Sequence, residues 1–340
     1  MNDFFRFDTD EERRALLIRA RKVALSAIRK YDVEWDNIQF IQLSGDTITY
    51  KIETSTDNNY LLRIHSDRLS REEIRSELLL LQALNKSKDL KVPEGMANCD
   101  SIYVLDIETE TGYRRPYITM MRWIEGEKVV GEFTDSQAYN IGVLMSRLHE
   151  AAKDFNPPSD FVRPTWGVES FKREMAKLER YYERFLSEEG WKLYQDAAEK
   201  VVSQLTTMYP SEHNYGLIHA DLHTGNMVFE DNQPYPIDFG RCGYGYYLYD
   251  MAGTILELWP KHRWMLIQGY ESIRKLETDY IRDLECFFVM FMIENCCHHS
   301  SDPRETTSLI DEQKYAQAYI REYLNGNPFL FEVIEPVNVD

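Results

Sequence analysis

Two segments decide the fold of this chain: His219-Ala220-Asp221-Leu222-His223-Thr224-Gly225-Asn226 and, twelve residues after Asn226, Asp238-Phe239-Gly240. They place an Asp and an Asn five positions apart on one loop, followed by a second Asp directly before Phe-Gly. This arrangement is typical of phosphoryl transfer, in which the protein contributes positioned charge rather than covalent chemistry. The sequence therefore predicts a kinase-like phosphotransferase.

Each of the three polar residues has an expected role in that chemistry. Asp221 would orient and deprotonate a hydroxyl group, whereas Asn226 and Asp238 would hold the Mg²⁺ ions that bridge the phosphates of ATP. Short apolar runs on both sides of the loop, Leu217-Ile218 and Met227-Val228-Phe229, would clamp it between buried strands.

Other polar residues near this loop allow more than one interpretation. His219, Asp221 and His223 alternate along the chain and could form a zinc or hydrolase cluster, but that leaves Asn226 and the Asp-Phe-Gly segment without roles. We expect His219 to hold the loop backbone instead. Asp250 is expected to accept hydrogen bonds from this backbone, to act as a helix N-cap, or to do both.

A second group of metal-ligating residue types lies near the C-terminus. Glu294, Cys297 and His298 could share one helix face by their spacing. The apolar run before them reads as a packed core helix, and no second pair of ligands is found elsewhere in the sequence. Structural cysteines are therefore the preferred interpretation.

Composition narrows the class of protein. Of the 340 residues, 43% are hydrophobic and 13% aromatic, which permits a substantial core and excludes global disorder. The net charge of −18 disfavours binding to nucleic acid and anionic membranes, and it favours a cationic substrate unless it only maintains solubility. Five cysteines without scaffold spacing, and no signal-like N-terminus, predict a cytoplasmic protein with free thiols; oligomeric state is not indicated.

Hydrophobic periodicity predicts three segments. Residues 1–35 form a helical extension, 36–125 a β-rich nucleotide-binding lobe, and 126–340 a large helical lobe with the catalytic loop and the acceptor site. The strands expected in the β-rich lobe cover residues 40–43, 48–52, 60–64, 102–107 and 117–123. Helices are expected near residues 9–28, 70–84, 134–149, 168–188, 191–208, 251–258, 262–275, 278–299 and 311–324. The result is an α+β, two-lobed fold.

Several residues of the β-rich lobe are candidates for nucleotide binding. Ser44 and Gly45 lie between two expected strands, where backbone N–H groups could approach a phosphate, although an ordinary hairpin turn would look the same. Arg63 supplies a cation for the phosphates and Glu77 a carboxylate to fix it; the alternative is that both are surface residues.

The linker at the end of this lobe is a further candidate. Met121 and Trp123 end the last expected strand, where such a linker lends backbone groups to the adenine edge and apolar side chains to its face. Any strand leaving a domain would show a similar pattern, so this assignment depends on the other motifs.

With these residues in hand, the chain resembles the aminoglycoside phosphotransferase and choline kinase-like family, which has a protein-kinase-like fold. The resemblance covers about residues 36–300 and is specific over His219–Asn226, Ile237–Gly240 and Tyr247–Ala252. Leu62-Arg63-Ile64-His65 and Ser76-Glu77-Leu78 look like the bacterial branch near homoserine-kinase-like and stress-response kinase-like proteins. Arg63 stands where much of the wider family has Lys, and Ser44–Thr47 is poor in glycine.

The resemblance implies ATP and Mg²⁺ binding between two lobes and transfer of the γ-phosphate to a hydroxyl group. It assigns the base to Asp221, Mg²⁺ binding to Asn226 and Asp238, and phosphate contact to Arg63 supported by Glu77. The favoured hypothesis is a kinase of a small molecule such as an aminoglycoside, amino-alcohol, amino acid or sugar. The alternatives are a protein Ser/Thr kinase of the same fold and a catalytically silent nucleotide-binding or structural homologue.

Overall fold

A computed structural model describes residues 3–7, 9–56 and 58–339 of the chain. These residues form two compact units. The first comprises the described residues up to Glu125 together with Phe155–Arg163, and the second comprises Gly126–Asp154 and the described residues from Pro164 onward. Residues 1, 2 and 340, at the outer ends of two expected domains, lie outside the described residues.

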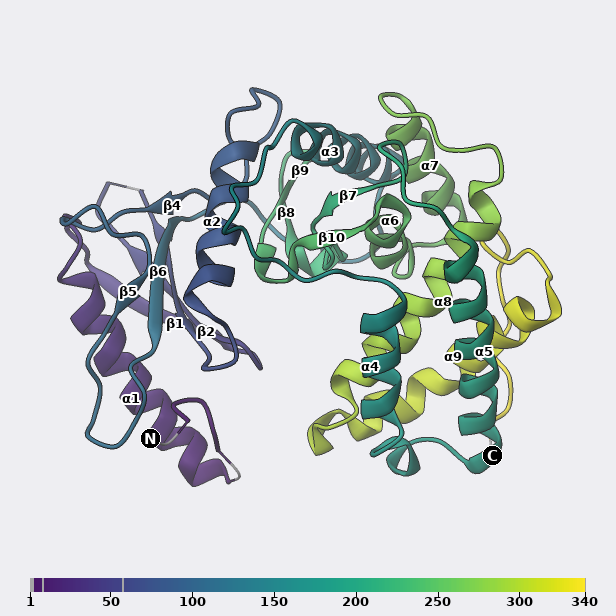
Figure 1. Cartoon of the computed structure of the whole chain (residues 1–340), viewed down its shortest axis with the longest axis horizontal. Coiled ribbons are helices and arrows are strands. Elements are labelled where there is room, and N and C mark those ends of the chain that lie inside the picture. The colour runs from purple at the N-terminus through teal and green to yellow at the C-terminus, as the bar shows by residue number, and fades with distance from the viewer. Residues whose placement is uncertain (1–2, 8, 57, 340) are drawn as a thin grey trace. The chain divides into compact units, whose positions relative to one another are not determined.

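The first unit is built on an antiparallel sheet with the strand order β1-β2-β3-β6-β4, and β5 also pairs with β6 (Figure 1). The strands are β1 (Asn37–Leu43), β2 (Thr47–Glu53), β3 (Tyr60–His65), β4 (Gly95–Met96), β5 (Leu105–Asp106) and β6 (Tyr117–Arg122). The strands expected at 40–43, 48–52, 60–64 and 117–123 are therefore confirmed.

The prediction of a strand at residues 102–107 is wrong, except that Leu105–Asp106 form β5. Asn98 closes a turn there: its Oδ1 accepts hydrogen bonds from the N–H groups of Asp100 (3.0 Å) and Ile102 (2.8 Å). Ser101 adopts a left-handed backbone conformation within this turn, with φ of 64°. A short polar side chain has thus replaced ladder hydrogen bonds with a local turn.

Two helices cover opposite faces of this sheet. The helices α1 (Asp10–Ile28) and α2 (Arg71–Leu84) begin with the expected capping boxes. The buried side of α1 packs in one apolar cluster with Leu62 and Ile64 of β3. Because successive strand residues alternate in direction, Arg63 faces the opposite side, where it pairs with Glu77 of α2. This is why β3 is buried on both faces.

The second unit is mainly helical. Its helices are α3 (Asp135–Lys153), α4 (Val168–Leu178), α5 (Glu188–Thr207), α6 (Tyr247–Ile255), α7 (Pro260–Glu271), α8 (Tyr280–His299) and α9 (Thr306–Asn325). The apolar run 286–293 is buried in the middle of α8, as expected for a core helix. Helices α4, α5 and α9 all pack on α8 (Figure 1).

The helix expected at residues 168–188 extends ten residues beyond the observed end of the helix. Helix α4 ends at Leu178, and a short 3₁₀ turn follows at Tyr182–Arg184. Ser187 then accepts a hydrogen bond from the N–H of Gly190 and so caps α5. The ring of Tyr182 stacks on that of Trp191 at 4.8 Å, which stabilises the turn against continuation of the helix.

Helices α3 and α7 approach each other through two glycines. A Cβ atom on Gly142 would lie 1.9 Å from the backbone O of Leu266, and one on Gly269 would lie 1.9 Å from the backbone O of Tyr139. Any side chain at either position would therefore separate the helices. The contact brings His149 of α3 and Tyr270 of α7 within hydrogen-bond distance, 3.0 Å.

Two short strand pairs carry the predicted catalytic segments. Strand β7 (Tyr215–Ile218) pairs with β10 (Gly243–Tyr246), and β8 (Met227–Glu230) pairs with β9 (Gln233–Pro236). The loop from His219 to Asn226 thus joins β7 to β8, and Asp238 lies between β9 and β10. Within the described parts of the chain, no helix combines the length and apolar character needed to cross a membrane.

Candidate active site

A buried carboxylate anchors the loop that precedes Asp221. Asp250 is 1% exposed and accepts hydrogen bonds from the backbone N–H groups of His219 (2.8 Å) and Ala220 (2.6 Å). The Nε2 atom of His149 lies 3.2 Å from the same carboxylate. Burial lowers the pKa of His149, and its hydrogen bond to Asp250 opposes that shift. With these partners the buried carboxylate fixes the backbone directly before Asp221.

The expectation that Asp250 is a helix N-cap is wrong. Helix α6 begins at Tyr247, so Asp250 lies inside its first turn rather than before it. Its carboxylate points to the loop instead of to the N–H groups of its own helix. The helix predicted at residues 251–258 therefore begins four residues earlier, at Tyr247.

Asn226 holds the side chain of Asp221. Its Nδ2 atom donates to the backbone O of Asp221 (2.9 Å) and to the carboxylate Oδ2 (3.0 Å). The amide oxygen of Asn226 takes no part in these contacts. The two residues that the sequence places five positions apart on one loop are therefore directly hydrogen-bonded in the structure.

Two residues of this region have left-handed backbone conformations although they are not glycine. The φ angles are 62° at Ala220, directly before Asp221, and 61° at Asp238. Such conformations cost about 1–3 kcal/mol each and persist only where surrounding contacts hold them. Here the Nε2 atom of His219 lies 3.0 Å from the carbonyl O of Ile237, and the N–H of Ile237 donates to the carbonyl O of Asn226 (2.9 Å). These contacts tie the loop to the segment bearing Asp238.

An arginine that the sequence analysis did not single out lies beside Asp221. The Nη1 atom of Arg241 is 3.9 Å from Oδ1 of Asp221, and both side chains are partly exposed. The guanidinium carbon lies 4.4 Å from the ring centre of Trp166, whose Nε1 donates to the carbonyl O of Arg241 (3.0 Å). Arg241 follows Asp238-Phe239-Gly240 directly, so its position could have drawn attention; nothing in the sequence marks Trp166.

A buried acid, Glu294, interacts with Tyr249 and with the charge of Arg241. Glu294 on α8 is 4% exposed, and its Oε2 atom accepts a hydrogen bond from the hydroxyl of Tyr249. Burial raises the pKa of Glu294 to about 7, the Tyr249 hydrogen bond and the charge of Arg241 oppose this shift, and the charge of Glu174 adds to it. Tyr249 stacks on Trp166 with an interplanar angle of 17°.

In the first unit, Arg63 and Glu77 form a buried ion pair. The Nη2 atom of Arg63 donates to Oε1 of Glu77, and each residue is 3% exposed. The alternative that both are surface residues is therefore wrong. His65, two positions along β3, lies 2.9 Å from the hydroxyl of Thr119, and burial followed by the charge of Arg63 lowers its pKa well below the usual range. Arg63 is thus held next to a neutral histidine.

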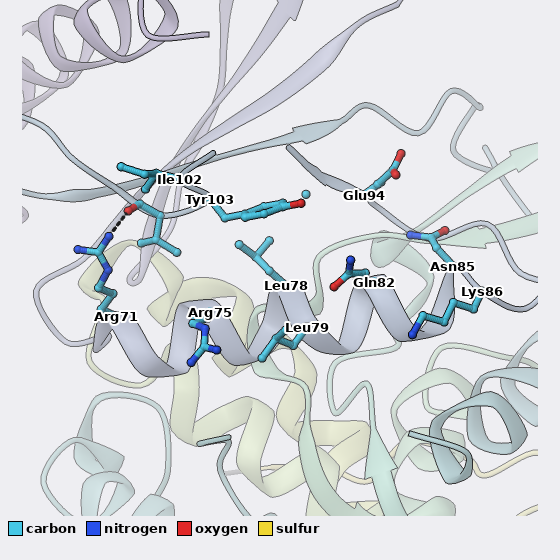
Figure 2. Close-up of a pocket in the computed structure, with 12 residues that line it drawn as sticks. Arg71, Arg75, Leu78, Leu79, Gln82, Asn85, Lys86, Glu94, Ile102 and Tyr103 are labelled. Carbon is cyan, nitrogen blue, oxygen red and sulfur yellow. Dashed lines mark hydrogen bonds between the residues drawn. The ribbon is translucent and has the colours of Figure 1, made fainter. Parts of the chain in front are cut away.

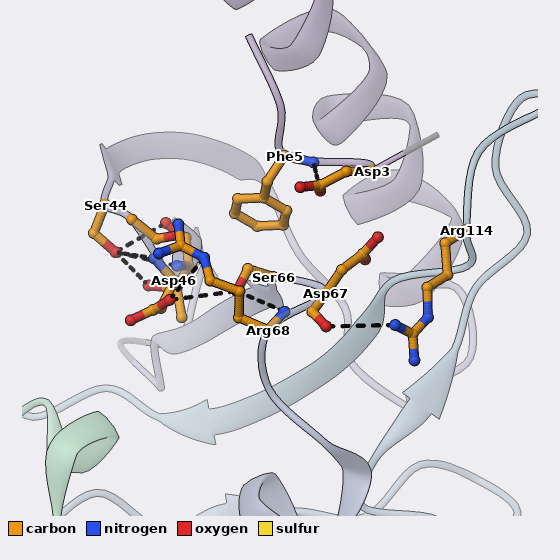
Figure 3. A network of polar contacts seen from close by, with 10 residues as sticks. Asp3, Phe5, Ser44, Asp46, Ser66, Asp67, Arg68 and Arg114 are labelled. Atoms are coloured by element: carbon orange, nitrogen blue, oxygen red, sulfur yellow. Dashed lines mark hydrogen bonds and ion pairs between the residues drawn. The ribbon is translucent and has the colours of Figure 1, made fainter. Parts of the chain in front are cut away.

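The turn that contains Ser44 and Gly45 joins β1 to β2 as a tight hairpin (Figure 3). Three of its N–H groups are used locally: Ser44 donates to the carbonyl O of Thr47 (2.9 Å), and Asp46 and Thr47 donate to the hydroxyl of Ser44. Arg68 also donates to the carbonyl O of Gly45 (2.5 Å). The turn is consequently closed on itself rather than arranged as a row of free donors.

The two expected adenine-binding residues have different surroundings. Met121 is 1% exposed within β6, where it pairs with Leu61 and Gly95. Trp123 is half-buried, and the Nζ atom of Lys51 lies 5.0 Å from its ring centre. Trp123 can therefore offer a ring face, whereas Met121 belongs to the core of the sheet.

A cavity of about 570 Å³ lies in the first unit between α2 and the segments around β4 and residues 102–104 (Figure 2). Leu78 and the ring of Tyr103 face each other across it, and Arg71, Arg75 and Lys86 stand at its edge. Arg71 and Arg75 are already paired with Asp106 and Asp160. None of the residues predicted to bind nucleotide lines this cavity.

Neither metal cluster considered from the sequence is found. The described residues contain no group of three or more His, Cys, Asp and Glu side chains placed to hold a metal ion. His223 instead accepts a hydrogen bond from the N–H of Gly225 through Nδ1 (3.1 Å). The five cysteines, all in the described part of the chain, are thiols rather than disulfides; Cys99 is exposed and the others are buried.

Comparison with known proteins places these observations in a family. Residues 39–280 match the family described as "Phosphotransferase enzyme family". The amicoumacin kinase of Bacillus subtilis (strain 168) is 26% identical over 247 residues, which cover 69% of this chain and 67% of that protein.

Solved structures show the same fold. A microcompartment-associated aminopropanol kinase is similar over 91% of this chain and 99% of its own, with a TM-score of 0.77 and 22% identity. An amicoumacin kinase in complex with AMP-PNP, Ca²⁺ and Ami is similar over 96% and 98%, with a TM-score of 0.76 and 18% identity. The expected α+β, protein-kinase-like fold is confirmed.

Proposed function

Because this chain belongs to the phosphotransferase enzyme family, we propose that it transfers the γ-phosphate of ATP to a hydroxyl group of a small molecule. Similar proteins that are named as kinases of amicoumacin and aminopropanol support a small-molecule acceptor. The neighbour bound to AMP-PNP, an ATP analogue, supports ATP as the donor. Amino-alcohols, amino acids, aminoglycosides and sugars are the acceptor classes considered.

The contact between Asn226 and Asp221 carries this proposal. The acceptor oxygen forms a bond to the γ-phosphorus, the bond from that phosphorus to the oxygen bridging to ADP breaks, and the hydroxyl proton passes to the carboxylate of Asp221. Asn226 donates to one carboxylate oxygen of Asp221 at 3.0 Å, and Asp250 fixes the backbone at Ala220, directly before Asp221. A base held in this way needs little reorganisation during the reaction.

Asn226 and Asp238 fit a magnesium site by the chemistry of their donors. Both offer the oxygen ligands that Mg²⁺ prefers, and the amide oxygen of Asn226 is not used in its contact with Asp221. When bound, Mg²⁺ would neutralise charge on the β- and γ-phosphates. The left-handed backbone at Asp238 sets the direction of its carboxylate.

In the first unit, Arg63 is the residue assigned to the phosphates of ATP. Glu77 restricts the guanidinium to one orientation, which lowers the entropy lost when a phosphate binds. Trp123 is assigned to the adenine ring because it retains a partly exposed face, whereas Met121 would contribute through the backbone of β6. Ser44 and Gly45 would cover the phosphates as a closed turn.

The proposal is tested by ADP formation from ATP and Mg²⁺ in the presence of fractionated cell extract. We expect Asp221→Asn to lower the rate by about 10³-fold or more, since general bases contribute about 10²–10⁴-fold, while ATP binding is retained. Asp196→Asn, an exposed change on α5, serves as the matched control and should keep the wild-type rate.

Other outcomes would favour the alternatives. The same reaction can be run with γ-labelled ATP. If the label enters protein instead of a small molecule, the chain is a protein kinase. If ATP binds but no fraction of the extract supports Asp221-dependent transfer, the catalytically silent homologue is favoured. Equal rates for wild type and Asp221→Asn would show that Asp221 is not the base.

A further inference from the structure

The guanidinium of Arg241 has unused donors beside the proposed base. Its nearest carboxylate is that of Asp221, and at 3.9 Å from Nη1 this contact is too long for a hydrogen bond. The Nε atom is buried without a partner, and the group donates no hydrogen bond to any residue in the described part of the chain. The side chain is nevertheless 31% exposed, so a ligand can reach it.

The position of this guanidinium is fixed by aromatic contacts. It stacks over Trp166 at 4.4 Å, and Trp166 donates its indole N–H to the carbonyl O of the same arginine (3.0 Å). Tyr249 also stacks on Trp166, with ring centres 6.0 Å apart. The N–H groups of a guanidinium lie in its own plane and are not consumed by contact with an aromatic face, so they remain available to a ligand.

The acids around Arg241 balance its charge without using its donors. Glu294 and Glu174 interact with it only as charges, and Glu294 accepts a hydrogen bond from the hydroxyl of Tyr249 instead. An arginine that is electrostatically balanced but not hydrogen-bonded can take up an anion without first breaking an ion pair. Arg63, the arginine assigned to the phosphates of ATP, differs because one of its N–H groups already donates to Glu77.

We infer that Arg241 binds a carboxylate of the phosphate acceptor, so that the acceptor is a hydroxy acid or a hydroxy amino acid. This rests on the proposed function, which it narrows. The planar guanidinium presents paired N–H donors that match the two oxygens of a carboxylate. A carboxylate held there would bring the hydroxyl of a short acceptor close to Asp221.

Local charge decides which end of a zwitterionic acceptor takes this place. The chain carries a net charge of −18, which attracts amines to its surface in general. The group next to Asp221 is a cation, however, and it would repel an ammonium at that position. The inference therefore separates amino acids from amino-alcohols, both of which carry an amine.

The test compares acids with their uncharged amides. Glycolate, L-serine, L-threonine and L-homoserine are each paired with the corresponding primary amide, and the full chain is used with Mg²⁺. Binding is followed by ligand-observed NMR in the presence of ADP, and turnover by ADP formation from ATP. We expect at least one acid to bind about ten-fold or more tightly than its amide, as loss of a charge-assisted bidentate contact predicts.

The variants assign that preference to the arginine. Arg241→Gln should reduce the acid-to-amide preference to about two-fold or less, Arg241→Lys should keep part of it, and the KM for ATP should not change. Arg173→Gln, an exposed change on α4, is the matched control and should keep the full preference. The acid-to-amide comparison in the wild-type chain does not depend on whether the Arg241 variants fold.

Three results would overturn the inference. The first is equal behaviour of acid and amide in every pair, including no binding of either. The second is an equal loss of kcat for every acceptor in Arg241→Gln, which would mean that Arg241 acts only on Asp221. The third is a raised KM for ATP in that variant, which would assign Arg241 to a phosphate. Failure of the proposed function is distinct: ADP formation would then be independent of Asp221 with any acceptor.

Discussion

Two arginine–carboxylate pairs, Arg63–Glu77 and Arg241–Asp221, differ in both burial and hydrogen bonding. In the first unit, Arg63 donates directly to Glu77, and both residues are 3% exposed. In the second unit, Arg241 lies 3.9 Å from Asp221, and the two side chains are 31% and 24% exposed. The first pair is buried and hydrogen-bonded, whereas the second is open and lacks a hydrogen bond.

This difference separates two uses of the same chemistry. A buried pair loses both solvation shells, so removing one partner strands an unpaired charge in the interior. An open pair at a longer distance contributes little to stability but leaves donors for a ligand. We therefore expect the Arg63–Glu77 pair to respond mainly in stability and the Arg241–Asp221 pair mainly in turnover and acceptor choice.

The largest effect on stability should come from breaking the buried pair. Glu77→Ala leaves the Arg63 cation buried without its carboxylate, and we expect the free energy of unfolding to fall by about 3–5 kcal/mol. Denaturant unfolding of the purified variant measures this loss. Glu72→Ala, exposed on the same helix, is the control and should cost less than about 1 kcal/mol. If Glu77→Ala lowered the free energy of unfolding as little as Glu72→Ala, the buried pair would contribute no more to stability than an open one.

A smaller effect, dependent on pH, is expected from Glu294 next to the open pair. Burial raises the pKa of Glu294 from 4.5 to about 7, so the folded state holds a proton that the unfolded state releases between these values. The unfolded state then binds fewer protons, and this contribution to stability is lost as pH rises through that window. The decline should total at most about 3–4 kcal/mol, at roughly 1.4 kcal/mol per pH unit.

Glu294→Gln removes the titrating group and should remove that part of the decline. The measurement is the free energy of unfolding of both proteins at several values between about pH 5 and pH 8. The groups that face Glu294 are Tyr249, Arg241 and Glu174, and they remain in the variant. Parallel curves for the two proteins would show that Glu294 has the same proton affinity folded and unfolded.

The smallest effect should come from a third arginine pair that is fully open. Arg68 lies 3.6 Å from Asp46, and the side chains are 68% and 53% exposed. We expect Arg68→Ala to change the free energy of unfolding by less than about 1 kcal/mol, and to leave the KM for ATP within about two-fold, because the Ser44–Thr47 turn closes through its own hydrogen bonds. A large rise in KM would show that Arg68 holds the turn in a working position.

The sequence could predict those parts of the fold that depend on local patterns. Thr9 with Glu12 and Ser70 with Glu73 predict helix starts that the structure confirms, because a capping box is complete within four residues. The spacing of Asp221 and Asn226 places both on one loop, and the structure adds the hydrogen bond between them. The strand predicted at residues 102–107 was wrong because Asn98, which lies outside that segment, forms the turn found there.

The parts that could not be predicted depend on contacts between distant segments. Trp166 meets Arg241 and Tyr249 across more than seventy positions, and no local pattern indicates this meeting. Asp250 was expected at a helix start, and its place inside α6 became clear only from the loop that it binds. Burial of Arg63 on β3 follows from helices on both faces of the sheet, which the strand pattern alone does not show.

The position of α1 has a consequence for the order in which the chain is made. Helix α1 ends at Ile28, but the sheet that covers its apolar side is complete only when β6 ends at Arg122, roughly 90 residues later. At about 5–20 residues per second, synthesis of that stretch takes roughly 5–20 s. During this interval the apolar side of α1 is covered only in part by its own chain, and the remainder is open to a chaperone at the ribosome or to another nascent chain.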